Sequence, residues 1–204
     1  MPETNAMTIF HIMRHGEHSQ QGKVAAGRLA GIGLSERGRG EVEAVAARLV
    51  DSGLAAIYAS PLERTRETAG IIGQRLGLPV AIRDELIEVD FGLWTGSTFD
   101  EVRADPRWHL WATQRSIATI PDGENMRQVQ RRIVDALIEL HQQHGDETVL
   151  VVSHGDVIRA ALAFVLGMPL DLFTRLEVAT ASLSTIRIDT AGLRVISVNE
   201  RLQT

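Results

Sequence analysis

The sequence predicts one α/β domain, built as a three-layer sandwich in which helices cover both faces of a largely parallel, mixed sheet. Its 204 residues are 44% apolar, which suits a single compact core. Apolar runs of strand length alternate with stretches of helical periodicity, an order typical of parallel sheets. No linker or long-period repeat divides the chain. We therefore expect a single domain over residues 1–204, with a flexible polar segment at residues 1–6.

Two strands and two helices are predicted in the first part of the chain. Ser35 is the expected N-cap of the first helix. Ser60 is the expected cap of the second helix, with Pro61 in its first turn. In chain order the elements are a strand at 8–13 (TIFHIM), a helix from 35 to about 53, a strand at 54–59 (LAAIYA) and a helix to about 76.

The second part of the chain continues the alternation after an irregular stretch, residues 85–119, which holds the three tryptophans Trp94, Trp108 and Trp111. Asn125, with Gln128 three residues later, forms a capping-box signal for a long helix. The predicted elements are a short strand at 80–83, a helix from 125 to about 144, a strand at 148–152 (TVLVV), a helix at 157–165, and paired strands at 183–188 and 193–198.

Composition excludes several kinds of function. The chain has no cysteine, so disulfides, thiolate metal sites and cysteine nucleophiles are impossible. A net charge of −5 gives no basic face for nucleic acid or an anionic membrane. No apolar run has membrane-spanning length and no leader is visible, so we expect a cytoplasmic protein, with a homodimer left open. His11 and His15 lack a third ligand at suitable spacing, so neither a metal nor another cofactor is predicted.

The informative feature is that two separate apolar strands each end in His-Gly, at His15-Gly16 and His154-Gly155. In open α/β sheets, ligands bind beyond the carboxyl ends of the strands, so both histidines can face one pocket. Arg14 and Arg64 also follow strands, and arginine matches phosphate oxygens at any working pH. Two imidazoles and two guanidinium groups predict a pocket for a phosphorylated small molecule.

These residues resemble the motifs of the histidine phosphatase, or phosphoglycerate-mutase-like, superfamily. The resemblance covers about three quarters of the chain, in the family's order. It comprises Arg14-His15-Gly16-Glu17, Ser60-Pro61-Leu62-Glu63-Arg64, Glu88-Val89-Asp90-Phe91-Gly92, Gly123-Glu124 and Ser153-His154-Gly155. It implies a phosphoglycerate-mutase-like fold and metal-independent phosphoryl transfer.

Carried over residue by residue, the resemblance implies that His15 is the nucleophile and that Glu88 donates a proton to the leaving oxygen. Arg14, Arg64 and His154 would hold the transferring phosphoryl group. Neighbouring arginines favour the neutral imidazole that nucleophilic attack requires.

Further phosphate or substrate contacts are expected from Gly16, Gly155 and Gln21. Gln21 stands where many family members have asparagine, and residues 27–34 lack the usual Asp-x-Pro, which leaves the substrate open. His18 is expected on the loop surface. Trp94 could contact substrate or belong to a small hydrophobic cluster.

Three functions remain after this reasoning. A phosphomonoester phosphatase is favoured because Val89 follows Glu88, where true mutases of the family typically carry arginine. The segment from Glu88 to Trp94 looks closest to the α-ribazole phosphatase and broad-specificity branch. A cofactor-dependent phosphoglycerate mutase is the first alternative, and a non-enzymatic module that binds phosphorylated ligands is the second.

Overall fold

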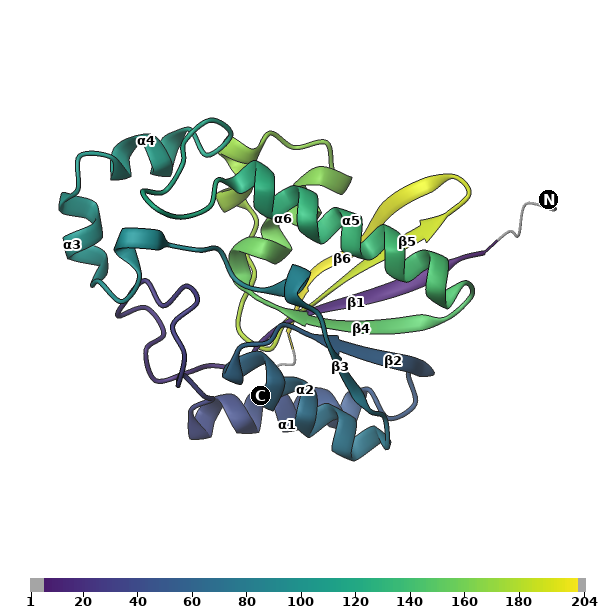
Figure 1. Ribbon diagram of the computed structural model, residues 1–204. Helices are drawn as coiled ribbons and strands as arrows, with labels where there is room; N and C mark the ends of the chain where they lie inside the picture. Colours follow the sequence, from purple (N-terminus) through teal and green to yellow (C-terminus); the bar gives the residue numbers. More distant parts are fainter. Residues whose placement is uncertain (1–5, 202–204) are drawn as a thin grey trace.

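The computed structural model describes residues 6–201, so the predicted flexible segment lies, apart from Ala6, outside the described residues. A six-stranded sheet of order β3-β2-β4-β1-β5-β6 forms the middle of the molecule (Figure 1). The strands are β1 (Thr8–Arg14), β2 (Leu54–Ala59), β3 (Val80–Ile82), β4 (Thr148–Ser153), β5 (Leu183–Asp189) and β6 (Gly192–Glu200).

The sheet is largely parallel, as predicted. β1 runs parallel to β4, and β2 runs parallel to both β4 and β3. β5 pairs antiparallel with β1 and with β6, so the predicted terminal hairpin is confirmed. Because four strands share one direction, their carboxyl ends meet at a single edge of the sheet.

Helices cover both faces, which confirms the three-layer prediction (Figure 1). Helices α1 (Glu36–Arg48) and α2 (Glu63–Leu76) lie on one face, and α5 (Met126–His144) and α6 (Gly155–Val165) lie on the other. Along β4, Val149 and Val151 pack in the core cluster of α5 and α6. The alternate residues Leu150 and Val152 pack with α1 and α2. This two-residue period explains why the strand reads as one continuous apolar run.

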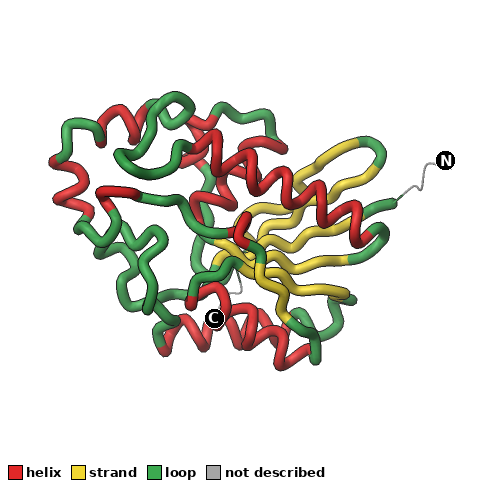
Figure 2. The backbone as a smooth tube through the Cα atoms, in the orientation of Figure 1, coloured by secondary structure: helices red, strands yellow, loops and turns green. Residues whose placement is uncertain are grey.

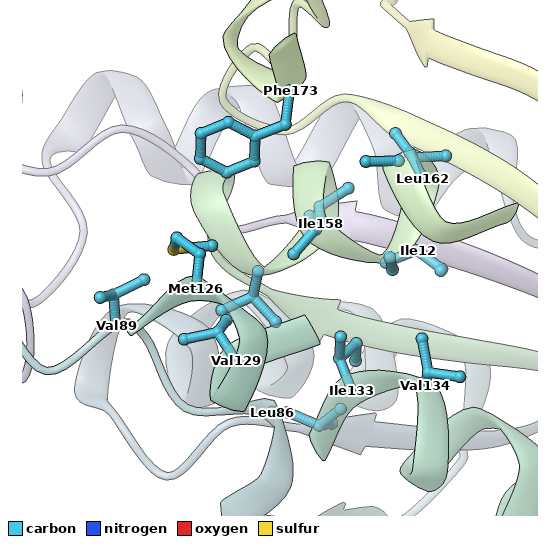
Figure 3. Packing of buried hydrophobic residues seen from close by; sticks show 14 of the residues in the cluster. Ile12, Leu86, Val89, Met126, Val129, Ile133, Val134, Ile158, Leu162 and Phe173 are labelled. Atoms are coloured by element: carbon cyan, nitrogen blue, oxygen red, sulfur yellow. The ribbon is translucent and has the colours of Figure 1, made fainter. Parts of the chain in front are cut away.

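Figure 3 shows the larger of the two core clusters, in which Ile133 of α5 and Ile158 of α6 meet Ile12 of β1. All three side chains are fully buried. Phe173, from the 3₁₀ helix η3 (Leu170–Arg175), points into the same cluster (Figure 3). The sheet is therefore supported on the side of α5 and α6 by a closely packed layer of apolar side chains.

Two of the three predicted helix caps are confirmed. Ser35 accepts a hydrogen bond from the amide of Gly38, and Asn125 forms a full capping box with Gln128. The Ser60 cap is wrong, because α2 begins at Glu63 after Leu62 and has no side-chain cap. The Ser60 hydroxyl instead lies 2.7 Å from Nε2 of His154. The Ser60 hydroxyl, which the local sequence pattern predicted as a helix cap, therefore has a partner distant in the sequence, His154.

Beyond the carboxyl edge, loops and short helices replace long regular elements, as expected for residues 85–119. They include η1 (Asp84–Leu86), η2 (Gly92–Trp94), α3 (Phe99–Ala104) and α4 (Trp108–Thr113). In Figures 1 and 2, η2, α3, α4 and the loop after β1 gather on the left, past the strand ends, whereas η1 lies beside α5. Within residues 6–201, no helix combines the length and apolar character needed to cross a membrane.

Candidate active site

A cavity of about 260 Å³ opens at the carboxyl edge of the sheet. One side of it, which we call the floor, is formed by five residues near the carboxyl ends of the strands. They are Arg14 at the end of β1, His15 directly after it, Arg64 in the first turn of α2, Glu88 in the loop after η1, and His154, which lies just behind the cavity wall. The opposite side, which we call the rim, is supplied by residues within 18–27 and 99–115. The fold therefore brings together residues up to 145 positions apart, since Arg14 and Arg159 both line this cavity.

The two histidines of the floor lie beside each other, with ring centroids 5.2 Å apart. The register of the central strands causes this, because Arg14 of β1 pairs with Ser153 of β4 and each histidine comes next. His15 is 2% exposed and His154 is fully buried. His15 lines the cavity, whereas His154 lies behind the cavity wall with its ring in an edge-type arrangement with that of His15.

The hydrogen bond of His15 determines which of its ring nitrogens carries the proton, and that of His154 involves a hydroxyl group. Nδ1 of His15 lies 2.8 Å from the carbonyl oxygen of Gly16. A carbonyl only accepts, so Nδ1 carries the proton and Nε2 keeps its lone pair. Ser60 Oγ accepts weakly from the Leu62 amide at 3.5 Å and lies 2.7 Å from His154 Nε2. In the tautomer in which the Ser60 hydroxyl donates to Nε2, His154 carries its own proton on Nδ1, which lies 4.0 Å from Oε2 of Glu88.

Half-buried Arg14 and buried Arg64 leave unpaired donors in the floor. Arg14 donates from Nη1 to the carbonyl of Val178, and Arg64 from Nη2 to that of Gly27, both at 2.7 Å. Nε of Arg14 and both Nε and Nη1 of Arg64 have no hydrogen-bond partner within residues 6–201. Unpaired buried donors on a cation are costly, and a phosphoryl group with three oxygens can satisfy them.

The local charges keep both imidazoles neutral. Burial, followed by the positive charges of Arg64 and Arg14, lowers the pKa of His15 well below its ordinary value. Burial and Arg64 also lower the pKa of His154 well below its ordinary value. His15 is therefore an uncharged nitrogen base at neutral pH, as attack on phosphorus requires.

Glu88 has the opposite character, that of an acid. Burial, together with the negative charge of Asp156, raises the pKa of Glu88 to about 7. Its Oε1 accepts from the Val89 amide at 2.9 Å, and its Oε2 lies 4.0 Å from Nδ1 of His154. The nearby carboxylates of Glu85 and Asp90 form ion pairs with Arg83 and Arg28. Of these three carboxylates, Glu88 alone lines the cavity.

The other predicted contacts fall in different places. Gly155 and Gln21 line the cavity, and Oε1 of Gln21 is buried with no partner among the described residues. Gly16 lies outside the cavity wall, and its amide donates to Thr68 Oγ1 at 3.1 Å. A Cβ at Gly16 would come within 2.6 Å of the Gly38 carbonyl oxygen, so this glycine permits close packing against α1.

Two expectations need correction. His18 is not on the surface: it is 6% exposed, lines the cavity, and its ring centroid lies 5.4 Å from that of His15. A β-bridge between His18 and Leu34 folds the loop back over the strand end. Trp94 does not reach the cavity; it packs in the core and donates from Nε1 to Asp105. Trp108 and Trp111 line the cavity instead.

Sequence reasoning missed three charged residues of the cavity wall, Arg115, Asp156 and Arg159. Asp156 and Arg159 stand three residues apart in the first turn and a half of α6, and this spacing directly after His154-Gly155 was a usable signal. Arg115 follows α4 in the irregular stretch and had no local signal. No group of three or more possible metal ligands occurs in the described part of the chain.

Comparison with known proteins gives a consistent result. The family model of the histidine phosphatase superfamily (branch 1) matches residues 10–201. The chain is 32% identical to "Phosphoserine phosphatase 1" of Hydrogenobacter thermophilus, over 95% of this chain and 92% of that protein. It is 31% identical to "Probable phosphoglycerate mutase GpmB" of Yersinia pestis, over 88% of this chain and 85% of that protein.

A solved structure agrees with these relatives. Bacillus stearothermophilus YhfR superimposes with a TM-score of 0.86 at 30% identity, and the match covers 96% of this chain and 98% of that one. The predicted fold, phosphoglycerate-mutase-like with helices on both faces of a mixed sheet, is confirmed.

Proposed function

Because this chain belongs to branch 1 of the histidine phosphatase superfamily, we propose that it hydrolyses phosphomonoesters through a covalent phosphohistidine on His15. One observation carries the proposal. The lone pair of His15 Nε2 lies in a floor where Arg14 and Arg64 offer buried donors without partners. That arrangement suits in-line attack on a phosphoryl group whose oxygens need positive charge.

In the first step, Nε2 of His15 attacks phosphorus and the bond from phosphorus to the ester oxygen breaks. The open donors of Arg14 and Arg64, with Nδ1–H of His154, bind the equatorial oxygens. Glu88 starts as the neutral acid, consistent with its pKa of about 7, and gives its proton to the leaving oxygen. The alcohol departs and the phosphoryl group stays on His15.

In the second step, the Glu88 carboxylate takes a proton from water, and the resulting hydroxide equivalent attacks phosphorus. The bond between phosphorus and Nε2 breaks, which releases inorganic phosphate and restores both His15 and the acid form of Glu88. Gly16 has a supporting role in this scheme, because its carbonyl holds the His15 ring in the reactive tautomer. We assign Gly155 and Gln21 to substrate contact, since both line the cavity.

The mutase is the second candidate, favoured by the likeness to a relative named as a phosphoglycerate mutase. A mutase must hold a bisphosphorylated intermediate, which calls for further basic contacts near the acid. Val89 follows Glu88 and is fully buried, so it offers the substrate nothing at this point. Hydrolysis is the better-supported reaction.

A screen with purified protein tests the proposal. We expect release of phosphate from several esters in the panel of phosphoserine, phosphoglycerates, sugar phosphates, nucleotides and p-nitrophenyl phosphate. Conversion of 3-phosphoglycerate to 2-phosphoglycerate, stimulated by 2,3-bisphosphoglycerate and faster than hydrolysis, would favour the mutase. Phosphate binding with no hydrolysis of any ester would favour the module without enzymatic activity.

A further inference from the structure

A second cationic group lies in the cavity wall away from the floor, and the proposed reaction does not use it. It consists of Arg115, which follows α4, and Arg159, in α6. Arg115 is only 8% exposed, yet Nε and Nη1 have no hydrogen-bond partner within the described chain. A buried guanidinium with unpaired donors in a cavity wall can bind an anionic group.

The position of Arg115 is fixed by aromatic rings. Its guanidinium carbon lies 4.8 Å from the ring centroid of Trp111 and 4.8 Å from that of Phe173. Phe173 is fully buried, and Figure 3 shows it pointing into the main core cluster. The guanidinium is therefore held in place before any ligand arrives, so little side-chain entropy is lost on binding.

Asp156 does not satisfy this arginine. Its Oδ1 accepts from Nη1 of Arg159 at 2.9 Å, while its Oδ2 lies 3.9 Å from Nη1 of Arg115, beyond hydrogen-bond distance. Nε of Arg159 donates to the Leu176 carbonyl at 2.9 Å. Arg159 is thus already hydrogen-bonded to a carboxylate and a carbonyl. Arg115 forms only a long ion pair with Asp156, and its Nε and Nη1 have no hydrogen-bond partner among the described residues.

The balance of charges in the cavity wall indicates which kind of group Arg115 would bind. Its wall holds four arginines and the carboxylates of Asp156 and Glu88, and Glu88 is neutral when it acts as the acid. Three positive charges remain once Asp156 is counted. A phosphoryl dianion on the floor balances two of them, so one charge remains for a further anionic group of the substrate.

We propose that Arg115 binds a carboxylate of the substrate, and that the enzyme acts on small phosphomonoesters that carry a carboxylate close to the ester. This inference rests on the proposed hydrolytic function. A cavity of about 260 Å³ admits molecules of this size. Arg115 selects the substrate in this account and takes no part in bond breaking.

Matched substrates test the proposal. We compare 3-phosphoglycerate with glycerol 3-phosphate, and phosphoserine with phosphoethanolamine, since each pair differs by the carboxylate. The wild-type enzyme should favour the acid in kcat/KM by about 10- to 100-fold, the usual worth of a charge-assisted hydrogen bond. Arg115→Gln should reduce this ratio to within about threefold of one, and Arg115→Lys should keep part of it.

The control is Arg131→Gln, because Arg131 lies exposed on α5, outside the cavity, and its loss should leave the ratio unchanged. A wild-type ratio near one would overturn the proposal. So would an equal loss for both members of each pair in Arg115→Gln, which is the result expected if Arg115 only stabilises the stack with Trp111 and Phe173.

Binding measurements separate this proposal from the proposed function. Calorimetry with 3-phosphonopropionate and propylphosphonate requires no turnover. Tighter binding of the carboxylated probe by wild type, lost in Arg115→Gln, supports the carboxylate site even if every ester proves stable. If Arg115→Gln does not fold, the wild-type ratios and Arg115→Lys decide the outcome: equal affinity for both probes overturns the proposal.

Discussion

The floor and the rim of the cavity are built in different ways. The floor residues Arg14, His15 and His154 take their positions from backbone pairing, because β1 and β4 are in register up to Arg14 and Ser153. The rim consists of loops and six-residue helices held by side chains, such as the Trp94 and Trp108 rings, whose centroids lie 5.8 Å apart. On this difference we base the proposal that residues at the strand ends carry out the reaction, whereas residues of the rim determine which substrate binds.

The largest effect should follow from a change in the floor. His15→Asn removes the attacking nitrogen, so we expect kcat to fall by about 10⁴-fold or more. Steady-state kinetics with p-nitrophenyl phosphate measures the loss, and thermal unfolding checks that the fold persists. The matched control is His109→Asn in the rim, since His109 is exposed and lies outside the cavity wall. Substantial turnover by His15→Asn would mean that the floor does not hold the nucleophile.

Glu88→Gln should produce the next largest effect, and its size should depend on the leaving group. Without a proton donor, alkyl phosphates should lose about 10²- to 10⁴-fold in kcat/KM. p-Nitrophenyl phosphate, whose leaving group departs without protonation, should lose less than about tenfold. The matched control is Glu85→Gln, because Glu85 pairs with Arg83 and lies outside the cavity wall. An equal loss for all esters would exclude Glu88 as the general acid.

The pH dependence should reveal the coupling between Glu88 and α6. Only protonated Glu88 can donate, so kcat/KM for an alkyl phosphate should fall as the pH rises through about 7, the pKa of this group. Asp156→Asn removes a negative charge that raises this pKa, so the falling limb should move to lower pH. Ionisation of the substrate contributes equally to the pH profiles of wild type and Asp156→Asn. A difference between the two profiles therefore reports the ionisation of Glu88.

Asp135→Asn is the control for that shift, because Asp135 lies on α5 and has a largely exposed side chain. A falling limb that stays in place in Asp156→Asn would show that Asp156 does not act on the acid.

The smallest effect should follow from the loss of an apolar side chain of the rim. Trp108 lines the cavity, and Trp108→Ala should raise KM by about 2- to 10-fold, the worth of a lost aromatic contact. kcat should change little, because the contact serves the ground state and the transition state equally. A loss confined to kcat would contradict the division between floor and rim.

The two histidines of the floor could be placed from the sequence because each directly follows an apolar strand. His15 and His154 come one residue after strands whose buried pattern is clear, and parallel strands bring such ends together. Ser60 was misread because the bond from its hydroxyl to His154 spans 94 residues, and a local capping pattern does not register such a partner.

The rim was less readable because its geometry depends on contacts between distant side chains. Arg115 owes its position to Trp111, four residues before it, and to Phe173, much later in the chain. His18 was assigned to the surface because the bridge to Leu34 that buries it has no periodic signature. Loops folded over a strand end therefore require coordinates before their residues can be assigned to a site.

The most direct test is to locate the phosphoryl group during turnover. Enzyme mixed with p-nitrophenyl phosphate is quenched in alkali, which preserves phosphohistidine, and its peptides are then analysed by mass spectrometry. Our account predicts a burst of p-nitrophenol equal to the enzyme concentration, and a phosphoryl group on His15 that is absent from His15→Asn. A phosphoryl group on His18, on His154 or on any other residue would contradict the account.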